Sequence, residues 1–162
     1  MKEFVAFFLS GKLYGADIAH MQGIEPYQEL VPAKDLPGCL QGLVNIRGDL
    51  IPVVDIRKHL TLPPTGITDE TKYIIFLTRN QRLACRIDGI SNIFKAEDAN
   101  IKGMPELTQT GDIHCLDCIV KNGNDLILII NPDNLLSDED WEQVRNMFAK
   151  IEEEKQRLPD AE

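Results

Sequence analysis

Apolar residues occur along most of the chain in short runs separated by polar breaks, and residues 42–57 show this pattern most clearly. Two apolar runs, 43–46 and 50–56, flank the break Arg47-Gly48-Asp49. This break predicts a β-hairpin, because glycine permits the positive φ that a tight turn often needs. The second run is apolar on both faces, with residues 50, 54 and 56 on one and 51 and 53 on the other. It therefore predicts a strand buried between two layers of core, with Arg47 at the rim of the turn.

The same pattern predicts further strands along the chain. They are expected at residues 4–9, 13–18, 21–27, 73–77, 83–87, 90–94, 113–120 and 126–130. Loops rich in proline, glycine or polar residues are expected at 28–41, 62–66 and 95–112, and a brief helical turn at 58–60. Nine or ten short strands with frequent turns are typical of a sandwich or a small barrel.

Residues 49–60 resemble residues 125–136 in their order of features. Each segment runs from a turn through a buried strand to an Asp or Asn residue and then to a short helical turn that ends at Leu. The Asp and Asn residues are Asp55 and Asn131. This similarity favours a duplicated unit and hence a doubled barrel.

A different periodicity begins at Ser137. Ser137 and Asp140 approximate a capping box, and the acidic residues that follow Ser137 suit the start of a helix. Apolar residues then recur at intervals of three and four, namely Trp141, Val144, Phe148 and Ile151. The sequence predicts an amphipathic, acidic helix over residues 137–162, ended by Pro159, whose apolar stripe docks on the β domain. Binding of a partner along that stripe is the alternative.

Composition narrows the possible functions. The chain has 162 residues, a formal net charge of −9 and no clustered basic patch, which argues against a nucleic-acid-binding surface. No apolar stretch is long enough to span a bilayer, and the run at 4–9 is too short for a signal peptide. We therefore expect a cytoplasmic protein with reduced thiols and no membrane insertion.

Few residues suggest chemistry. Cys115 and Cys118 have the spacing of metal ligands and His114 stands beside them, so a metal- or redox-sensing domain is one hypothesis. The pair lies in a strand-like run, however, where residues three apart point to opposite faces. No serine lies in a Gly-x-Ser-x-Gly elbow, and no glycine-rich phosphate loop is present. We expect no enzymatic activity, no cofactor and no metal.

Taken together, these motifs resemble the CheW family of bacterial chemosensory adaptors. The most specific match is Gly42-Leu-Val-Asn-Ile-Arg-Gly48 followed by Ile51-Pro-Val-Val-Asp-Ile-Arg57; the others begin at Tyr14, Asp88 and Asp125. The resemblance implies a mainly β fold of two intertwined five-stranded SH3-like β-barrels, with a C-terminal α-helix. The implied division is a CheW-like domain at 1–136, with barrel subdomains at about 14–70 and 71–136 that exchange strands, followed by the helix at 137–162.

The resemblance also implies partners and a binding site. Family members are not enzymes, and they couple the regulatory domain of a CheA-type histidine kinase to the cytoplasmic tips of chemoreceptors. The receptor-binding positions of the family fall at Gly42, Arg47 and Gly48, and Met21 lies on the same expected groove. Arg47 would donate forked hydrogen bonds to the receptor, and the glycines would allow a receptor helix to approach closely. Kinase contact is expected at a barrel end, without assigned residues.

One departure from the family pattern bears on the partner. Many members carry Gln-Glu after the residue that corresponds to Met21, whereas this chain has Gln22-Gly23. Together with the long acidic helix, this motivates an alternative, a regulatory or decoy protein that binds only the kinase or only the receptor, in a non-flagellar pathway.

Overall fold

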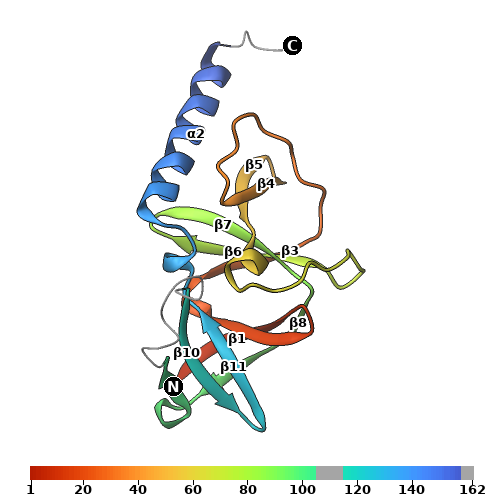
Figure 1. Cartoon of the computed structure of the whole chain (residues 1–162), viewed down its shortest axis with the longest axis vertical. Helices are drawn as coiled ribbons and strands as arrows, with labels where there is room; N and C mark the ends of the chain where they lie inside the picture. Colours follow the sequence, from red (N-terminus) through yellow and green to blue (C-terminus); the bar gives the residue numbers. More distant parts are fainter. Residues whose placement is uncertain (105–114, 158–162) are drawn as a thin grey trace.

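The computed structural model describes residues 1–104 and 115–157, and within them the chain is mainly β. Two sheets lie one above the other along the long axis of the molecule, and one long helix rises beside the upper sheet (Figure 1). The N-terminus lies at the lower sheet, and the C-terminal helix points away from it. The mainly β fold with a C-terminal helix is thus confirmed.

In the described part of the chain, the lower sheet has six strands in the order β8-β1-β2-β11-β10-β9. Their bounds are β1 Lys2–Leu9, β2 Lys12–Asp17, β8 Gly89–Ala96, β9 Ile101–Gly103, β10 Leu116–Asn122 and β11 Asp125–Ile130. All neighbours are antiparallel except β11 and β2, which run parallel with Ile129 opposite Gly15.

The upper sheet has five strands in the order β3-β6-β7-β5-β4. Their bounds are β3 Met21–Pro26, β4 Leu40–Ile46, β5 Asp49–Val54, β6 Lys72–Thr78 and β7 Gln81–Ile87. Its one parallel pair is β5 with β7, with Val53 opposite Ala84. Each sheet therefore joins two antiparallel hairpins through one parallel contact.

The two sheets exchange strands. The hairpin β1–β2 belongs to the lower sheet, but the next strand, β3, pairs with β6 in the upper sheet. In the same way β6–β7 belongs to the upper sheet, and the next strand, β8, pairs with β1 in the lower sheet. Each sheet is therefore built from both halves of the chain.

This topology confirms the similarity between residues 49–60 and 125–136. Strands β5 and β11 each pair antiparallel with the preceding strand and parallel with a strand from the other half. Each then ends at a capping residue. Asp55 accepts a hydrogen bond from the backbone N–H of Lys58 in the helical turn α1 (Ile56–His59), and Asn131 accepts one from Asp133 in η5 (Pro132–Asn134).

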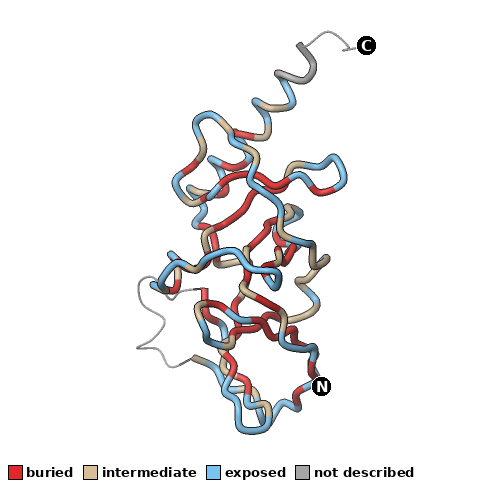
Figure 2. The backbone as a smooth tube through the Cα atoms, turned by 90° about the vertical axis from the view of Figure 1, so that its right-hand side faces the viewer, coloured by how far each residue is buried: buried red, intermediate tan, exposed pale blue. Residues whose placement is uncertain are grey.

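The described residues form three apolar clusters. One lies inside the curve of the lower sheet, where Phe94 of β8 and Val120 of β10 share a cluster although β8 is an edge strand. A second lies inside the upper sheet and joins Val44 of β4 to Tyr27, which follows β3. Ile101 of the other edge strand, β9, packs against the first cluster, so side chains from opposite edges meet inside each sheet, and the curved path of the lower one is visible in Figure 2.

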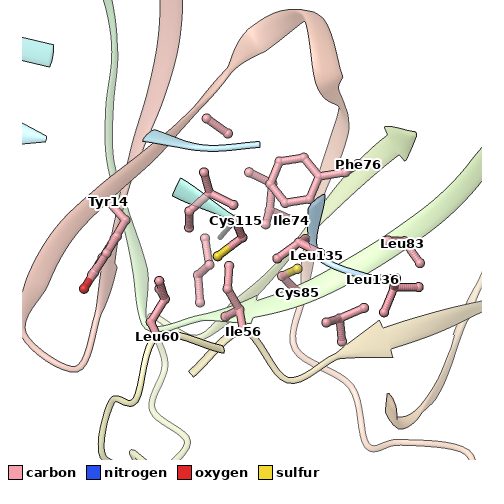
Figure 3. Close-up of a cluster of buried hydrophobic side chains, with 14 of the residues drawn as sticks. Tyr14, Ile56, Leu60, Ile74, Phe76, Leu83, Cys85, Cys115, Leu135 and Leu136 are labelled. Carbon is pink, nitrogen blue, oxygen red and sulfur yellow. The ribbon is translucent and has the colours of Figure 1, made fainter. Parts of the chain in front are cut away.

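The largest cluster fills the space between the sheets (Figure 3). It contains Tyr14 of the lower sheet, Ile74 and Phe76 of the upper sheet, Ile56 of α1, and Leu135, which follows η5. Strand β5 contributes to two clusters, because Ile51 and Val53 face the inside of the upper sheet while Val54 faces the space between the sheets. The prediction of a strand buried on both faces is confirmed.

Closed five-stranded SH3-like barrels are not confirmed. The lower sheet has six strands, and in neither sheet do the two edge strands pair with each other within the described residues. The additional strand is β9, which lies with η2 (Asp98–Asn100) inside the region 95–112 that was expected to be a loop. A three-residue strand among polar residues gives too short a pattern to be recognised. The predicted strand 113–120 is described only from residue 115, as β10.

The C-terminal helix, α2 (Asp138–Arg157), begins as predicted. The hydroxyl of Ser137 accepts a hydrogen bond from the Asp140 N–H at 3.0 Å, and the Asp140 carboxylate accepts one from the Ser137 N–H at 3.4 Å. Trp141 and Val144 are buried in the cluster between the sheets, joined by Met147, while the last two residues of the predicted stripe are half-buried against it. The helix docks on the β domain; Pro159 lies outside the described residues.

A buried polar network joins the sheets. Arg57 of α1 is 5% exposed, and its guanidinium donates hydrogen bonds to the carbonyl oxygen of Arg86 and to the carboxylate of Asp88. Asp88 lies at the crossover from β7 to β8 and also accepts hydrogen bonds from the Ser10 N–H and the Thr65 hydroxyl, both at 2.7 Å. Burial lowers the pKa of Arg57 and Asp88 opposes that effect. The network holds the turn of β1–β2, in the lower sheet, against α1 of the upper sheet.

Candidate functional site

The turn between β4 and β5 is the centre of the predicted site. Ile46 pairs with Asp49, so Arg47 and Gly48 form a two-residue loop. Their φ angles are 54° and 91°, and positive φ at both positions is characteristic of a type I′ hairpin turn. Asn45 fixes the turn further, because its side-chain oxygen accepts a hydrogen bond from the Gly48 N–H at 2.9 Å. The predicted hairpin and the positive φ of Gly48 are confirmed.

Arg47 projects from this turn with most of its surface free. Its side chain is 84% exposed, and one guanidinium nitrogen lies 3.4 Å from Oε1 of Glu25 on β3. The Glu25 side chain is only 18% exposed. Because β3 and β4 are the two edge strands of the upper sheet, this ion pair joins the hairpin tip to the opposite edge. The ion pair with Glu25 thus engages one nitrogen of the Arg47 guanidinium, and the other N–H donors of this group stay available to a partner.

A second ion pair holds the other side of the turn. Asp49 follows Gly48, and its carboxylate lies 3.1 Å from a guanidinium nitrogen of Arg82 on β7. Both side chains are substantially exposed, so the pair adds little to stability. Together, the two ion pairs place positive and negative charges on both sides of the turn. Such a charge pattern favours one orientation of a docking partner over others.

The other predicted residues lie in different surroundings. Met21 begins β3, opposite Phe76, and packs half-buried against the cluster between the sheets. Gly42 of β4 is buried, and a Cβ there would come within 3.1 Å of Leu30. The close approach that Gly42 permits is therefore made by Leu30 of the same chain. The structure places Arg47 and Gly48 at one exposed point, while Gly42 lies beneath an intramolecular contact.

Gly23, where the sequence departs from the family pattern, lies close to Glu25 on β3. The two residues are separated by one position on β3, and a Cβ added at Gly23 would have no neighbour within 4 Å. Alternate residues of a strand share a face, so Glu25 supplies an acid on the face of Gly23, one step further along. Sequence reasoning missed Glu25. The signal that could have indicated Glu25 was the presence of an acid on a predicted strand that also contains glycine and proline.

The cysteine arrangement does not favour the metal or redox hypothesis. Cys115 is buried in the cluster between the sheets, whereas Cys118 packs against the cluster inside the lower sheet, so the two thiols lie on opposite faces. Burial raises the pKa of both to about 11, with a further contribution from Asp117 at Cys118. A thiol with a raised pKa is a poor nucleophile and a poor metal ligand at neutral pH. His114 lies outside the described residues.

Residues 1–104 and 115–157 lack two other features that would indicate a function. These residues contain no group of three or more His, Cys, Asp or Glu side chains positioned to hold a metal ion. Nor does that part of the chain contain a helix with the length and apolar character needed to cross a membrane.

Comparison with known proteins gives a consistent result. Residues 3–140 match the family model described as the CheW-like domain. The chain is 30% identical to the chemotaxis protein CheW of Bacillus subtilis over 138 residues, covering 85% of this chain and 88% of that protein. It is 28% identical to the chemotaxis protein CheW of Klebsiella aerogenes, covering 90% and 88%.

A solved structure supports the same assignment. The scaffolding protein TtCheW from Thermoanaerobacter tengcongensis superposes with a TM-score of 0.75 at 26% sequence identity, covering 83% of this chain and 91% of that one. The fold, the family match and the relatives agree: this chain belongs to the CheW-like domain family, whose proteins are non-enzymatic scaffolds or adaptors of chemotaxis.

Proposed function

We propose that the protein is a cytoplasmic adaptor that couples a CheA-type histidine kinase to the cytoplasmic tips of chemoreceptors. Membership of the family supports the adaptor role, and the Arg47-Gly48 turn is the observation that carries the receptor contact. The turn has type I′ geometry and is braced by the Asn45 hydrogen bond, and it presents an exposed guanidinium. A preorganised cation of this kind loses little entropy when it binds a carboxylate or carbonyl group.

The receptor segment would contact the hairpin tip and the edge strand β3 together. Arg47 and Gly48 supply the polar end of this surface, and Met21 supplies an apolar residue on β3. Binding must compete with the Glu25 ion pair, but a surface pair of this kind is worth at most about 1 kcal/mol. Gly42 takes an indirect role in this proposal, since it lets Leu30 lie flat against β4.

The proposal extends to the architecture. The ten strands other than β9 fall into two equivalent sets, β8-β1-β2-β11-β10 and β3-β6-β7-β5-β4, each curved around its own apolar cluster. We assign each set to one SH3-like barrel, and the division near residues 70 and 71 separates the two halves of the chain that exchange strands between these barrels. The kinase would contact a barrel end.

The test measures binding of a receptor-tip fragment and a CheA regulatory domain to purified protein. Replacing Arg47 by Glu reverses the exposed charge beside Glu25, and we expect affinity for the receptor fragment to fall by about 2 kcal/mol, roughly thirtyfold. Kinase binding should stay unchanged. The matched control is Arg145→Glu, the same change on the exposed part of α2, which should alter neither affinity. Loss of both affinities in a folded Arg47→Glu variant would disprove the site, and absence of both in the wild type would disprove the function.

A decoy that binds only one partner is the second candidate, favoured by Gly23. Because a side chain at Gly23 would meet no neighbour within 4 Å, Gly23→Glu restores the family acid without disturbing the fold. Wild type that binds only the kinase, with receptor binding gained by Gly23→Glu, would establish the decoy. Binding of both partners by the wild type would exclude it.

A further inference from the structure

A groove separates the C-terminal helix from the segment 31–37. Its volume is about 540 Å³, and its floor is formed by Leu43 and Leu50 on the face of the β4–β5 hairpin that points away from the inside of the upper sheet. Met147 and Ile151 of α2 form one wall. Figure 1 shows α2 standing beside the hairpin β4–β5. The groove uses neither Arg47 nor Met21, so it is distinct from the proposed receptor surface.

The groove results from how α2 docks. Trp141 and Val144, near the start of the helix, are fully buried, whereas Ile151 is only half-buried although it continues the same apolar stripe. The stripe therefore passes from the core into the groove and leaves apolar surface uncovered there. Apolar surface of this kind on a helix beside a hairpin is a common docking place for an amphipathic segment.

The opposite wall is held in place by the backbone. Val31 and Leu43 exchange two backbone hydrogen bonds, of 2.6 and 3.3 Å, which fasten the start of the segment 31–37 to β4. Pro32 and Pro37 restrict the segment further, since each fixes its own φ. The groove is thus formed before any partner binds, which reduces the entropy lost on binding.

Charge at the rim indicates what would fill the groove. Lys34 stands on the segment 31–37 and Lys150 on α2, one on each wall, and both are exposed. Neither forms an ion pair with the described part of the chain. Asp35 is the one acid among the described residues of the lining, so these residues carry a net positive charge although the chain has a net charge of −9. An apolar floor between two unpaired lysines is complementary to a segment that alternates apolar and acidic residues.

We propose that this groove binds an acidic amphipathic segment of a partner protein. Apolar side chains of the segment lie on Leu50 and Ile151, and its carboxylates pair with Lys34 and Lys150. Gln143 and Asn146, which also line the helix wall, are placed to bond polar groups of the segment. The proposal is independent of the receptor and kinase contacts, and it assigns a third docking surface to the protein.

The test is a titration of the full chain, followed by amide NMR shifts, with short synthetic helix-forming peptides. The first peptide combines Leu, Glu and Ala; the second has Lys in place of Glu, and the third has Ser in place of Leu. We expect saturable shifts at residues of the groove with the first peptide alone. Equal binding of the Lys peptide would overturn the charge argument, and equal binding of the Ser peptide would overturn the apolar argument.

Charge reversal then locates the contact. Lys150→Glu should weaken binding of the Leu–Glu peptide by about tenfold, whereas Arg145→Glu, the same charge change on the same helix outside the groove lining, should change it less than about twofold. If both variants weaken peptide binding equally, the attraction is a general electrostatic one, and the proposed site is refuted. If the NMR shifts of groove residues change with protein concentration in the absence of peptide, the groove binds a second copy of the chain. If octanoate displaces the peptide, the groove binds small amphiphiles. Either result overturns the proposal.

Discussion

The hairpins β4–β5 and β10–β11 occupy equivalent places in the two sheets but have different tips. The first turn is Arg47-Gly48, with positive φ at both residues and an ion pair to β3. The second is Gly123-Asn124, in which only Gly123 has a positive φ, and it leads to Leu126, which is 68% exposed. The shared framework therefore sets where each tip lies, and the loop residues decide what each tip offers to a partner.

The segments after these hairpins differ in the same way. Arg57, two residues after the cap Asp55, is buried and paired with Asp88. Asp133, two residues after the cap Asn131, lies 3.9 Å from His20, with both side chains partly exposed. Each residue contacts the crossover that leads to the exchanged strand. Equivalent positions thus carry opposite charges and very different burial.

The largest expected effect tests this pair of contacts. Asp88→Asn removes the negative charge that balances buried Arg57. It also replaces one of the two Asp88 oxygens that accept hydrogen bonds from Ser10, Arg57 and Thr65. We therefore expect the free energy of unfolding to fall by about 3 kcal/mol. Asp133→Asn at the partly exposed contact keeps one side-chain oxygen to accept the hydrogen bond of the Thr78 hydroxyl, so it should cost less than about 1 kcal/mol. Urea unfolding of both variants measures the difference. Similar losses would show that the two contacts are energetically equivalent.

A smaller effect tests the two parallel contacts. Gly15 faces Ile129 in the lower sheet, as Ala84 faces Val53 in the upper one. A Cβ at Gly15 would lie 2.8 Å from the Val5 carbonyl oxygen and 2.9 Å from Ile129, so Gly15→Ala should destabilise the protein by about 2 kcal/mol through overpacking.

The reverse change is the control for Gly15. Ala84→Gly should cost only about 1 kcal/mol, because it adds backbone freedom to the unfolded chain and removes a small buried group. Thermal unfolding of both variants gives the ranking. A Gly15→Ala variant as stable as wild type would show that the two sheets tolerate the same residue at this contact.

The smallest effect separates stability from binding at the first tip. Arginine at φ 54° is strained in a type I′ turn, where Asn-Gly is favoured, so Arg47→Asn should stabilise the protein by about 0.5 kcal/mol. It should also weaken receptor binding, because the guanidinium is lost. A variant that is less stable than wild type would show that the Glu25 ion pair outweighs the backbone strain.

Local patterns allowed most of the fold to be predicted. Short apolar runs and turn residues located ten of the eleven described strands, and the capping box located the start of α2. The exchange of strands between sheets follows from pairings far apart in sequence, such as Met21 with Phe76, and it was expected only through family resemblance. The short strand β9 had no pattern long enough to detect.

The candidate site was harder to predict. The positive φ of Gly48 follows from the turn sequence, but the Glu25 partner of Arg47 depends on how the upper sheet curves. The covering of Gly42 by Leu30 depends on the path of a loop without periodic pattern. The groove beside α2 could be predicted only if the packing angle of the helix on the sheet were known. These features are set by tertiary contacts, which a single sequence does not encode in a local signal.

The exchange of strands has a consequence during synthesis. When the first sixty residues leave the ribosome, β3 has no neighbour, because its partner β6 begins at Lys72, and β1 lacks β8 until residue 96 is made. The nascent chain therefore carries unpaired edges, which favour aggregation and call for chaperone protection. The completed chain has high contact order and should fold slowly for its size. A gene cut in the connection between α1 and β6 would yield two fragments that are soluble only when they are produced together.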